Sequence, residues 1–205
     1  METSGLQAGG PVTAILMASG FSKRFGGANK LLYPFRGKAL VLYTLELVSA
    51  GGLFENIFFV TAFDAAAALA ARFKGITIIR NANPERGQRE SIRLGVEAAE
   101  KTVDFEDGHY IFFPCDQPFL DGESLQLILN ARRRSHIVQP FYRGEKGSPV
   151  LFSRTFGAEL AALAPGEHGR DIIKKYPDKL IRVDTPPREG PSPLTDIDDP
   201  EMLAR

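Results

Sequence analysis

The segment from Leu16 to Lys30, LMASGFSKRFGGANK, places glycines, hydroxyls and cations directly after an apolar run. Glycine allows positive φ and close backbone approach, so the main-chain N–H groups of Gly20, Gly26 and Gly27 can point at phosphate oxygens. Further donors and positive charge come from Ser22, Lys23, Arg24 and Lys30. The spacing matches neither a P-loop nor a G-x-G-x-x-G dinucleotide loop. The segment therefore predicts an anion-binding loop of another type; the alternative is a surface turn with solvated cations.

Carboxylates that could serve a metal occur in two later segments. Asp116 ends the apolar stretch HYIFFPCD, and Asp196 and Asp198 lie in the tail segment TDIDDPEML. Mg²⁺ takes one or two carboxylates and keeps several waters, so these residues are candidate ligands. An isolated aspartate is more often a helix cap, and we expect Asp121 to be one. One cysteine and three scattered histidines offer no zinc or iron–sulfur pattern.

The segment GQRES opens an expected helix and offers Gly87, Gln88 and Ser91. Backbone N–H groups and a hydroxyl at a helix start can bind a base edge or a ribose. An ordinary capping loop would have the same composition, so both interpretations remain open.

Apolar periodicity alternates between strand and helix along the chain. It predicts a mainly parallel sheet with helices on both faces. The expected strands are residues 12–17, 56–62, 76–81, 109–116, two arms within 136–152, and 179–185. The expected helices are residues 39–52, 64–73 with Asp64 as N-cap, 90–101, 121–134 with a basic last turn, 154–164, 169–176 and 199–203.

Ligands of such folds bind beyond the carboxyl ends of the strands, where the strand order switches. The glycine-rich loop follows the first strand and Asp116 follows a later one, so we expect them to converge with the tail. We expect a single domain over residues 11–205, preceded by a disordered tail at 1–10.

The overall charge is balanced, because Lys plus Arg and Asp plus Glu both number 25. No net field favours nucleic acid or an anionic membrane, so neither is an expected partner. Cys115 cannot form an internal disulfide, and the start METSGLQAGGP lacks the basic and apolar regions of a secretory signal. No apolar run approaches the roughly 18–20 residues that span a bilayer. We expect a cytoplasmic protein.

Taken whole, ILMASGFSKRFGGANKLL resembles the signature of the MobA-like nucleotidyltransferases, L-A-A-G-x-S-x-R-x-G-x-x-K. One extra residue separates the second glycine from the lysine. CDQPFL resembles the G-D-Q-P-x-L element of the molybdenum cofactor cytidylyltransferase branch, and TDIDDPEML resembles its D-I-D-T-P-E-D element. NPERGQRESIRLG and GEKGSPVLF are similar to two further segments of the family. The resemblance extends over nearly the whole chain from Val12. It implies a single Rossmann-like α/β domain that transfers a nucleoside monophosphate to a phosphorylated acceptor.

The resemblance also implies site residues. Arg24 and Lys30 would stabilise charge on the reacting phosphates. Asp116 and Asp198 would hold Mg²⁺, with Asp196 as the second choice in the tail. The residues expected to bind the nucleotide are Ala18, Ser19, Gly20, Ser22, Gly26, Gly87 and Ser91. Those expected to bind the acceptor are Gln117, Pro118, His168 and Arg170.

Similarity to the cytidylyltransferase branch implies transfer of CMP from CTP to the terminal phosphate of molybdopterin cofactor, with transient contact to a molybdenum hydroxylase. Ser19, Arg86, Cys115 and Asp199 depart from the family pattern, and Arg86 leaves the base and the acceptor open. The alternatives are a guanylyltransferase, a transferase acting on a sugar or polyol phosphate, and a non-catalytic carrier of the cofactor.

Overall fold

The computed structural model of the chain describes residues 9–25, 29–102 and 107–203. Most of the expected disordered tail, and Gly26 and Gly27 of the glycine-rich loop, lie outside these residues.

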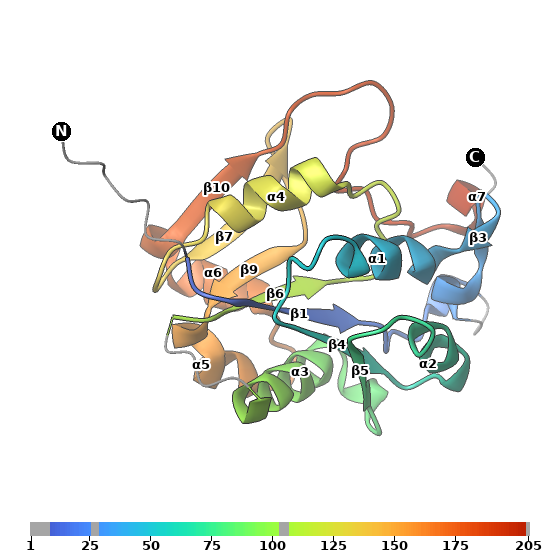
Figure 1. The fold of residues 1–205 in the computed structure, drawn as a ribbon, viewed down its shortest axis with the longest axis horizontal. Helices are drawn as coiled ribbons and strands as arrows, with labels where there is room; N and C mark the ends of the chain where they lie inside the picture. Colours follow the sequence, from blue (N-terminus) through green and yellow to red (C-terminus); the bar gives the residue numbers. More distant parts are fainter. Residues whose placement is uncertain (1–8, 26–28, 103–106, 204–205) are drawn as a thin grey trace.

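An eight-stranded sheet forms the centre of the molecule, in the order β10–β7–β9–β6–β1–β4–β5, with β8 paired to β7 (Figure 1). Its strands are β1 (Val12–Met17), β4 (Asn56–Thr61), β5 (Ile76–Arg80), β6 (His109–Phe113), β7 (Ile137–Tyr142), β8 (Glu145–Lys146), β9 (Val150–Ser153) and β10 (Leu180–Asp184). β9 runs antiparallel to β6 and β7, and β8 runs antiparallel to β7. The other neighbours in the sheet pair in parallel. The expected mainly parallel sheet is confirmed.

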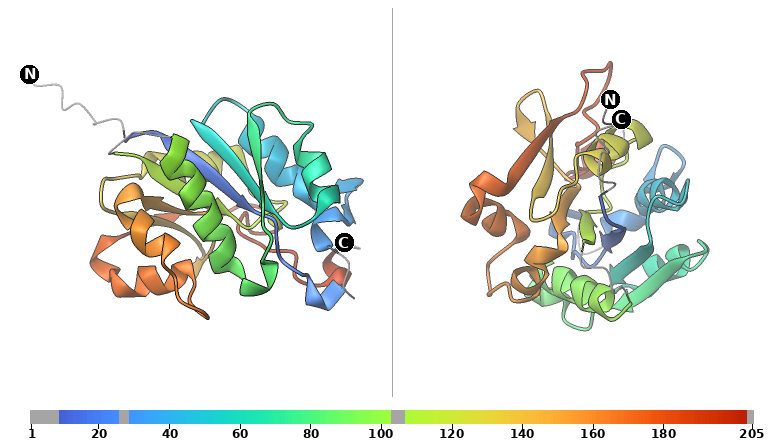
Figure 2. Two further views of the ribbon diagram at one scale, coloured as in Figure 1. Left: turned by 90° about the horizontal axis from the view of Figure 1, so that it is seen from below. Right: turned by 60° about the vertical axis from the view of Figure 1, so that its left-hand side comes forward.

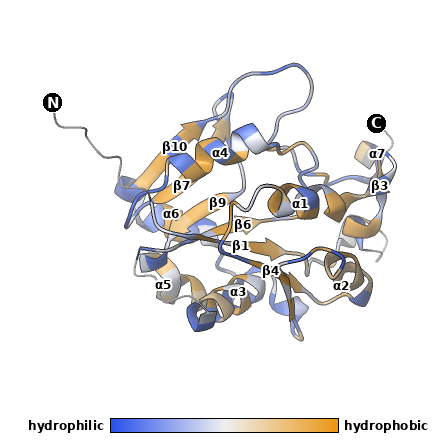
Figure 3. Ribbon diagram, in the orientation of Figure 1, coloured by the Kyte–Doolittle hydropathy of each residue, from blue (hydrophilic) through white to orange (hydrophobic). Residues whose placement is uncertain are grey.

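Helices cover both faces of this sheet, as the alternating sequence predicts (Figures 1 and 2). One apolar core includes residues of α1 (Leu40–Ser49), α2 (Asp64–Ala70) and α4 (Gly122–Asn130). A second core includes residues of α3 (Gln88–Thr102), α5 (Gly157–Ala161) and α6 (Gly169–Lys175). Successive side chains of β1 alternate between the two, since Leu16 belongs to the first and Ile15 to the second. The central strands are therefore apolar along their length (Figure 3).

Three expectations about helix ends can be checked. Asp121 is the N-cap of α4, as expected, and its carboxylate accepts from the amide of Ser124 at 2.8 Å. The expected cap at Asp64 is wrong, because Phe63 precedes the helix and Asp64 is its first residue. The basic last turn of α4 is also wrong, since α4 ends at Asn130. Arg132 follows the helix and donates to the carbonyl of Leu129 and to the backbone carbonyls of residues 9 and 10.

Smaller elements complete the fold. They are the hairpin of β2 (Pro34–Phe35) and β3 (Lys38–Ala39), the helix α7 (Pro200–Leu203), and 3₁₀ turns at Lys23–Phe25, Lys30–Leu32, Pro84–Arg86, Arg154–Phe156 and Pro177–Lys179. Every helix in the described part of the chain is too short or too polar to cross a membrane.

Candidate active site

The strand order switches at β1. β1 pairs with β4, the next strand of the main sheet along the chain, on one side and with the later β6 on the other, and Leu16 aligns with Phe113. The loops that leave the carboxyl ends of β1 and β6 therefore begin side by side, at the position where open α/β sheets bind ligands.

The loop after β1 starts from a fixed base. The amide of Ala18 donates to the carbonyl of Val60 at 2.8 Å, and the Ser19 hydroxyl donates to the same carbonyl at 3.1 Å. The Thr61 hydroxyl donates to the carbonyl of Ala18 at 3.0 Å. The first two residues of the loop are thereby held on the end of β4, whereas Gly20 is exposed and open.

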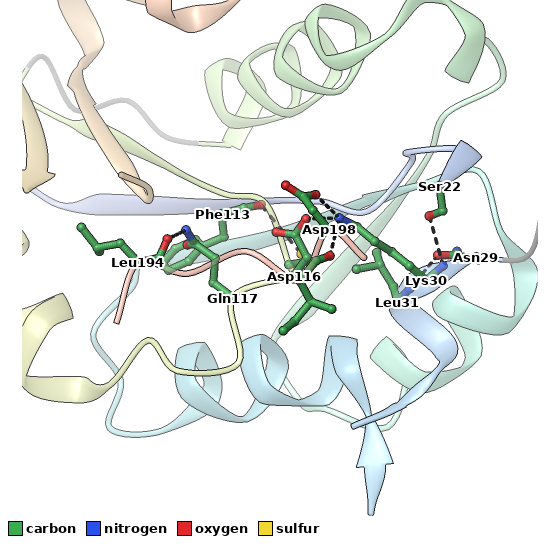
Figure 4. A network of polar contacts seen from close by, with 11 residues as sticks. Ser22, Asn29, Lys30, Leu31, Phe113, Asp116, Gln117, Leu194 and Asp198 are labelled. Carbon is green, nitrogen blue, oxygen red and sulfur yellow. Dashed lines mark hydrogen bonds and ion pairs between the residues drawn. The ribbon is translucent and has the colours of Figure 1, made fainter. Parts of the chain in front are cut away.

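Lys30 lies inward from this loop and joins two distant parts of the chain (Figure 4). Its amide donates to the Ser22 hydroxyl at 3.0 Å. Its Nζ lies 2.6 Å from Oδ2 of Asp116 and 3.1 Å from Oδ1 of Asp198, and it donates to the carbonyl of Ile197 at 2.9 Å. Burial by itself would lower the pKa of Lys30, but the charges of Asp116 and Asp198 and the hydrogen bonds to them together raise the pKa. Lys30 is therefore a charged, partly buried cation rather than a solvated one.

Asp116 follows Cys115, which has a positive φ of 65° at the turn out of β6. The Asp116 side chain is 12% exposed, and its Oδ1 has no hydrogen-bond partner among the described residues. Burial raises the pKa of Asp116, and Lys30 only partly opposes that rise. A carboxylate oxygen that is buried yet unpartnered is available to a cation.

The tail returns to this edge of the sheet, as expected, because the amide of Ile197 donates to the carbonyl of Asp116 at 2.9 Å. It places Asp196 and Asp198 on either side of that contact. The Asp198 side chain is 58% exposed. Partial removal of the Asp196 carboxyl from water and the charge of Asp116 raise the pKa of Asp196 to about 6, although the residue keeps an exposed surface.

The carboxylates fit a divalent cation that also binds a phosphate. No group of three or more His, Cys, Asp or Glu residues is arranged around a metal position in the described residues. Asp116 and Asp198 nevertheless both contact Lys30, and one of them has a free buried oxygen. Mg²⁺ in phosphate-transferring sites commonly takes one or two carboxylates, with water and substrate oxygens completing its shell.

A cavity of about 620 Å³ opens beside the loop after β1. It brings together Ser19, Gly20, Ser22, Gly87 and Ser91, five of the residues expected to bind the nucleotide. Ala18 is buried beneath the loop, and Arg24 is exposed and does not line the cavity. The segment GQRES therefore lies across the cavity from the glycine-rich loop.

A second cavity, of about 310 Å³, shares Met17 and Gln88 with the first. It contains His168 and Arg170, at the start of α6, and has an apolar floor that includes Phe112. The other two residues expected to bind the acceptor are not with them. Gln117 and Pro118 are buried, and Gln117 donates to the carbonyl of Leu194 at 3.2 Å. Their expected role stays a prediction.

Sequence reasoning missed two features of this region. Gln139 and Ser148 line the second cavity. Gln139 could have been noticed as a polar residue inside the otherwise apolar strand IVQPFY. The Ile197 carbonyl that accepts from Lys30 is a main-chain group, and no side-chain pattern reveals it.

Comparisons with known proteins identify the family of the chain. Residues 14–180 match the model of the MobA-like NTP transferase domain. The chain is 25% identical over 177 residues to nicotine blue oxidoreductase of Paenarthrobacter nicotinovorans, covering 83% of this chain and 84% of the relative. It is 28% identical over 124 residues to the molybdenum cofactor guanylyltransferase of Cupriavidus metallidurans, covering 58% of this chain and 54% of that relative. A nucleotidyl transferase of Methanothermobacter thermautotroptrophicus superposes with a TM-score of 0.75 at 20% identity, covering 96% and 95% of the two chains.

Proposed function

The chain belongs to the family of MobA-like NTP transferase domains, and from this premise we propose that it transfers CMP from CTP to the terminal phosphate of molybdopterin cofactor. An oxygen of the acceptor phosphate attacks the α-phosphorus of the nucleotide. The bond from that phosphorus to the bridging oxygen breaks, and pyrophosphate leaves.

One observation carries the proposal: Lys30 lies between Asp116 and Asp198 at the strand-order switch. Joining two phosphates brings anions together, so the reaction needs fixed positive charge with little covalent chemistry from the protein. Lys30 is fixed and charged, and exposed Arg24 extends from the same loop. A non-catalytic carrier would have no need of a buried cation held between two carboxylates.

Asp116 and Asp198 would hold the Mg²⁺ of the nucleotide, which supplies positive charge to the departing phosphates. Lys30 neutralises the same two carboxylates in the chain itself. When nucleotide and metal bind, we expect the Lys30 ammonium group to exchange some of its hydrogen bonds to the protein for hydrogen bonds to phosphate oxygens.

The two adjoining cavities support a two-substrate reaction. The larger one has the glycine-rich loop and the start of α3 as its walls, which suits the nucleotide. The smaller one combines an apolar floor with Gln88, Gln139 and Arg170, which suits a planar, polar ring system carrying an anionic group. Met17 and Gln88 line both cavities, whereas Lys30, Asp116 and Asp198 line neither.

A second candidate is guanylyl transfer to the same acceptor. The similarity to a molybdenum cofactor guanylyltransferase favours it, whereas the likeness of CDQPFL and GEKGSPVLF to the cytidylyl branch favours CTP. The choice between CTP and GTP is therefore the more specific part of the proposal. A pocket that hydrogen-bonds one base edge leaves groups unpaired with another base, so discrimination of roughly 10²-fold or more is expected.

The test is pyrophosphate release from CTP, GTP, ATP and UTP, with Mg²⁺ and with or without molybdopterin cofactor. We expect CTP to give the highest kcat/KM, with release that depends on the cofactor. A preference for GTP would assign the chain to guanylyl transfer. Because one relative is named an oxidoreductase, NADH and NADPH oxidation is followed in parallel. No pyrophosphate release with any triphosphate would refute the transferase proposal.

A further inference from the structure

The segment from Thr185 to Asp198, which we call the strap, connects one edge of the sheet to the candidate active site. It leaves β10, makes the long excursion seen in Figure 1, and returns to Asp116. Its first residue is fixed, because the Thr185 amide donates to the carbonyl of Phe141 at 2.8 Å. Its far end is fixed by the bond from the Ile197 amide to Asp116.

Arg188 fastens the middle of the strap to the loop after β6. Its guanidinium pairs with the carboxylate of Asp121, donates to the carbonyl of Phe119 at 2.7 Å, and donates to the carbonyl of Pro191 at 3.2 Å. The Arg188 side chain is 30% exposed. A planar guanidinium can satisfy such a set of acceptors at once, whereas an ammonium group cannot hold the same geometry.

A second fastening lies closer to the site. Gly147, beside the β7–β8 hairpin, leaves no room for a side chain: a Cβ there would lie 2.6 Å from Cβ of Leu194. The carbonyl of Leu194 accepts from Gln117, the residue after Asp116. The strap therefore packs closely against the protein at Leu194, three residues before Ile197.

These fastenings bear on Asp198 because little else holds it. Its carboxylate is 58% exposed, and within the described residues it forms an ion pair with Lys30. The Ile197 carbonyl that accepts from Lys30 belongs to the same segment. Both contacts exist only while the strap keeps its path.

We propose that Arg188 is a positioning residue for the active site, which, through the strap, sets where Ile197 and Asp198 meet Lys30. The inference rests on the proposed function for its catalytic consequence, but its structural part stands alone. Neither Arg188 nor Gly147 lines the candidate substrate cavities, although the Gly147 carbonyl accepts from Gln139, which lines the second one.

Three variants test it: Arg188→Ala, Arg188→Lys and Gly147→Ala. The matched control is Arg72→Ala, which removes an exposed arginine that follows α2. Hydrogen exchange is measured on peptides covering residues 193–199 and on peptides from β1 and β4. Mn²⁺ binding is measured without nucleotide, by the loss of its free-ion EPR signal on addition of protein, and pyrophosphate release is measured in a separate assay.

We expect Arg188→Ala and Gly147→Ala to speed exchange at residues 193–199 at least tenfold while leaving β1 and β4 unchanged. Both should weaken Mn²⁺ binding about tenfold and lower kcat more than they raise the KM for nucleotide. Arg188→Lys should restore part of the loss, because it keeps the pairing with Asp121 but not the two carbonyl contacts. The control should behave as the wild type.

The inference is overturned if exchange at residues 193–199 stays at the wild-type rate in both Arg188→Ala and Gly147→Ala. It is equally overturned if exchange rises but Mn²⁺ binding does not change, or if the wild type itself binds no Mn²⁺. Should Arg188→Ala fail to fold, Gly147→Ala and Arg188→Lys decide the question by the same readouts. Normal Mn²⁺ binding in a wild type that turns over no triphosphate would refute the proposed function and leave the strap inference standing.

Discussion

Lys30 shows how much a single residue depends on its surroundings. As a loop lysine it is expected to be solvated, and its loss should then leave thermal stability almost unchanged. The structure contradicts that expectation, because the Lys30 side chain is only 16% exposed and lies against a carboxylate that is 12% exposed. Removing one member of a largely buried ion pair strands the other charge, which costs more than a surface pair contributes.

Replacing Lys30 with methionine keeps most of the side-chain length and removes the charge. We expect pyrophosphate release to fall by about 10²-fold or more, because one preorganised donor to the transition state is lost. Stability should fall too, by up to about 3 kcal/mol, since Asp116 loses its cation. Steady-state kinetics and thermal unfolding measure the two effects. Activity close to that of the wild type would remove Lys30 from the mechanism.

The two tail carboxylates can be separated by amide substitutions that keep side-chain size. Asp198 contacts Lys30 directly, whereas no ion pair joins Asp196 to it within the described residues. We expect Asp198→Asn to abolish metal-dependent turnover and Asp196→Asn to reduce it only a few-fold, because Mg²⁺ needs the ligand charge. Turnover as a function of Mg²⁺ concentration is the measurement. An active Asp198→Asn together with an inactive Asp196→Asn would reverse the assignment.

At the scale of elements, the distance between α3 and the sheet decides where the segment GQRES lies. Gly95 is buried where α3 crosses β1, and a Cβ there would lie 2.4 Å from Cγ2 of Ile15, which is itself fully buried. The close approach brings the start of α3, with Gly87 and Ser91, beside the loop after β1.

The substitution Gly95→Ala has two opposing effects on the stability of the protein. Alanine favours a helix over glycine by about 1 kcal/mol, whereas forcing a methyl group into a packed core costs about 1–3 kcal/mol. With the clash falling on a fully buried side chain, we expect the cost to prevail and the melting temperature to drop by a few degrees. Gly122→Ala is the control, because Gly122 begins α4 with open space around its Cβ position. Stabilisation by Gly95→Ala would mean that α3 can move away from the sheet.

At the scale of the whole molecule, a buried imidazole at the opposite end of β6 links stability to pH. His109 is 2% exposed, its Nδ1 has no partner among the described residues, and its Nε2 lies 3.3 Å from the carbonyl of Arg133. Burial lowers the pKa of His109, and the charge of Arg132 lowers it further, while the Arg133 carbonyl and Asp107 oppose the shift.

The sign of the pH effect follows from that shift. Below about pH 6.5 the unfolded chain binds a proton at His109 that the folded chain resists, so stability is lost as pH falls from there towards the folded pKa. We expect His109→Phe to remove a slope of up to about 1.4 kcal/mol per pH unit in that window. Urea unfolding at pH 7.5, 6.0 and 5.0 compares the two proteins. Parallel pH curves would show that His109 is protonated equally in both states.

The sequence by itself determined the element types and the candidate residues. Strand and helix periods follow from which side chains must be buried, so the alternation predicts the mainly parallel sheet with helices on both faces. Asp121 could be recognised as a cap because a capping carboxylate acts on amides two or three residues away. The cations of the loop, the aspartate at a strand end and the family resemblance also placed Lys30, Asp116 and the tail aspartates among the candidates.

Only the tertiary structure decided how these residues act. The expectations for Asp64 and for the basic residues after Asn130 were wrong because an apolar pattern does not define the end of a helix to within one or two residues. The partial burial of Lys30 and the separation of Gln117 from His168 depend on contacts across more than 50 residues. Burial and neighbouring charges set the pKa of a side chain. Both depend on how the whole chain packs rather than on any one segment of it.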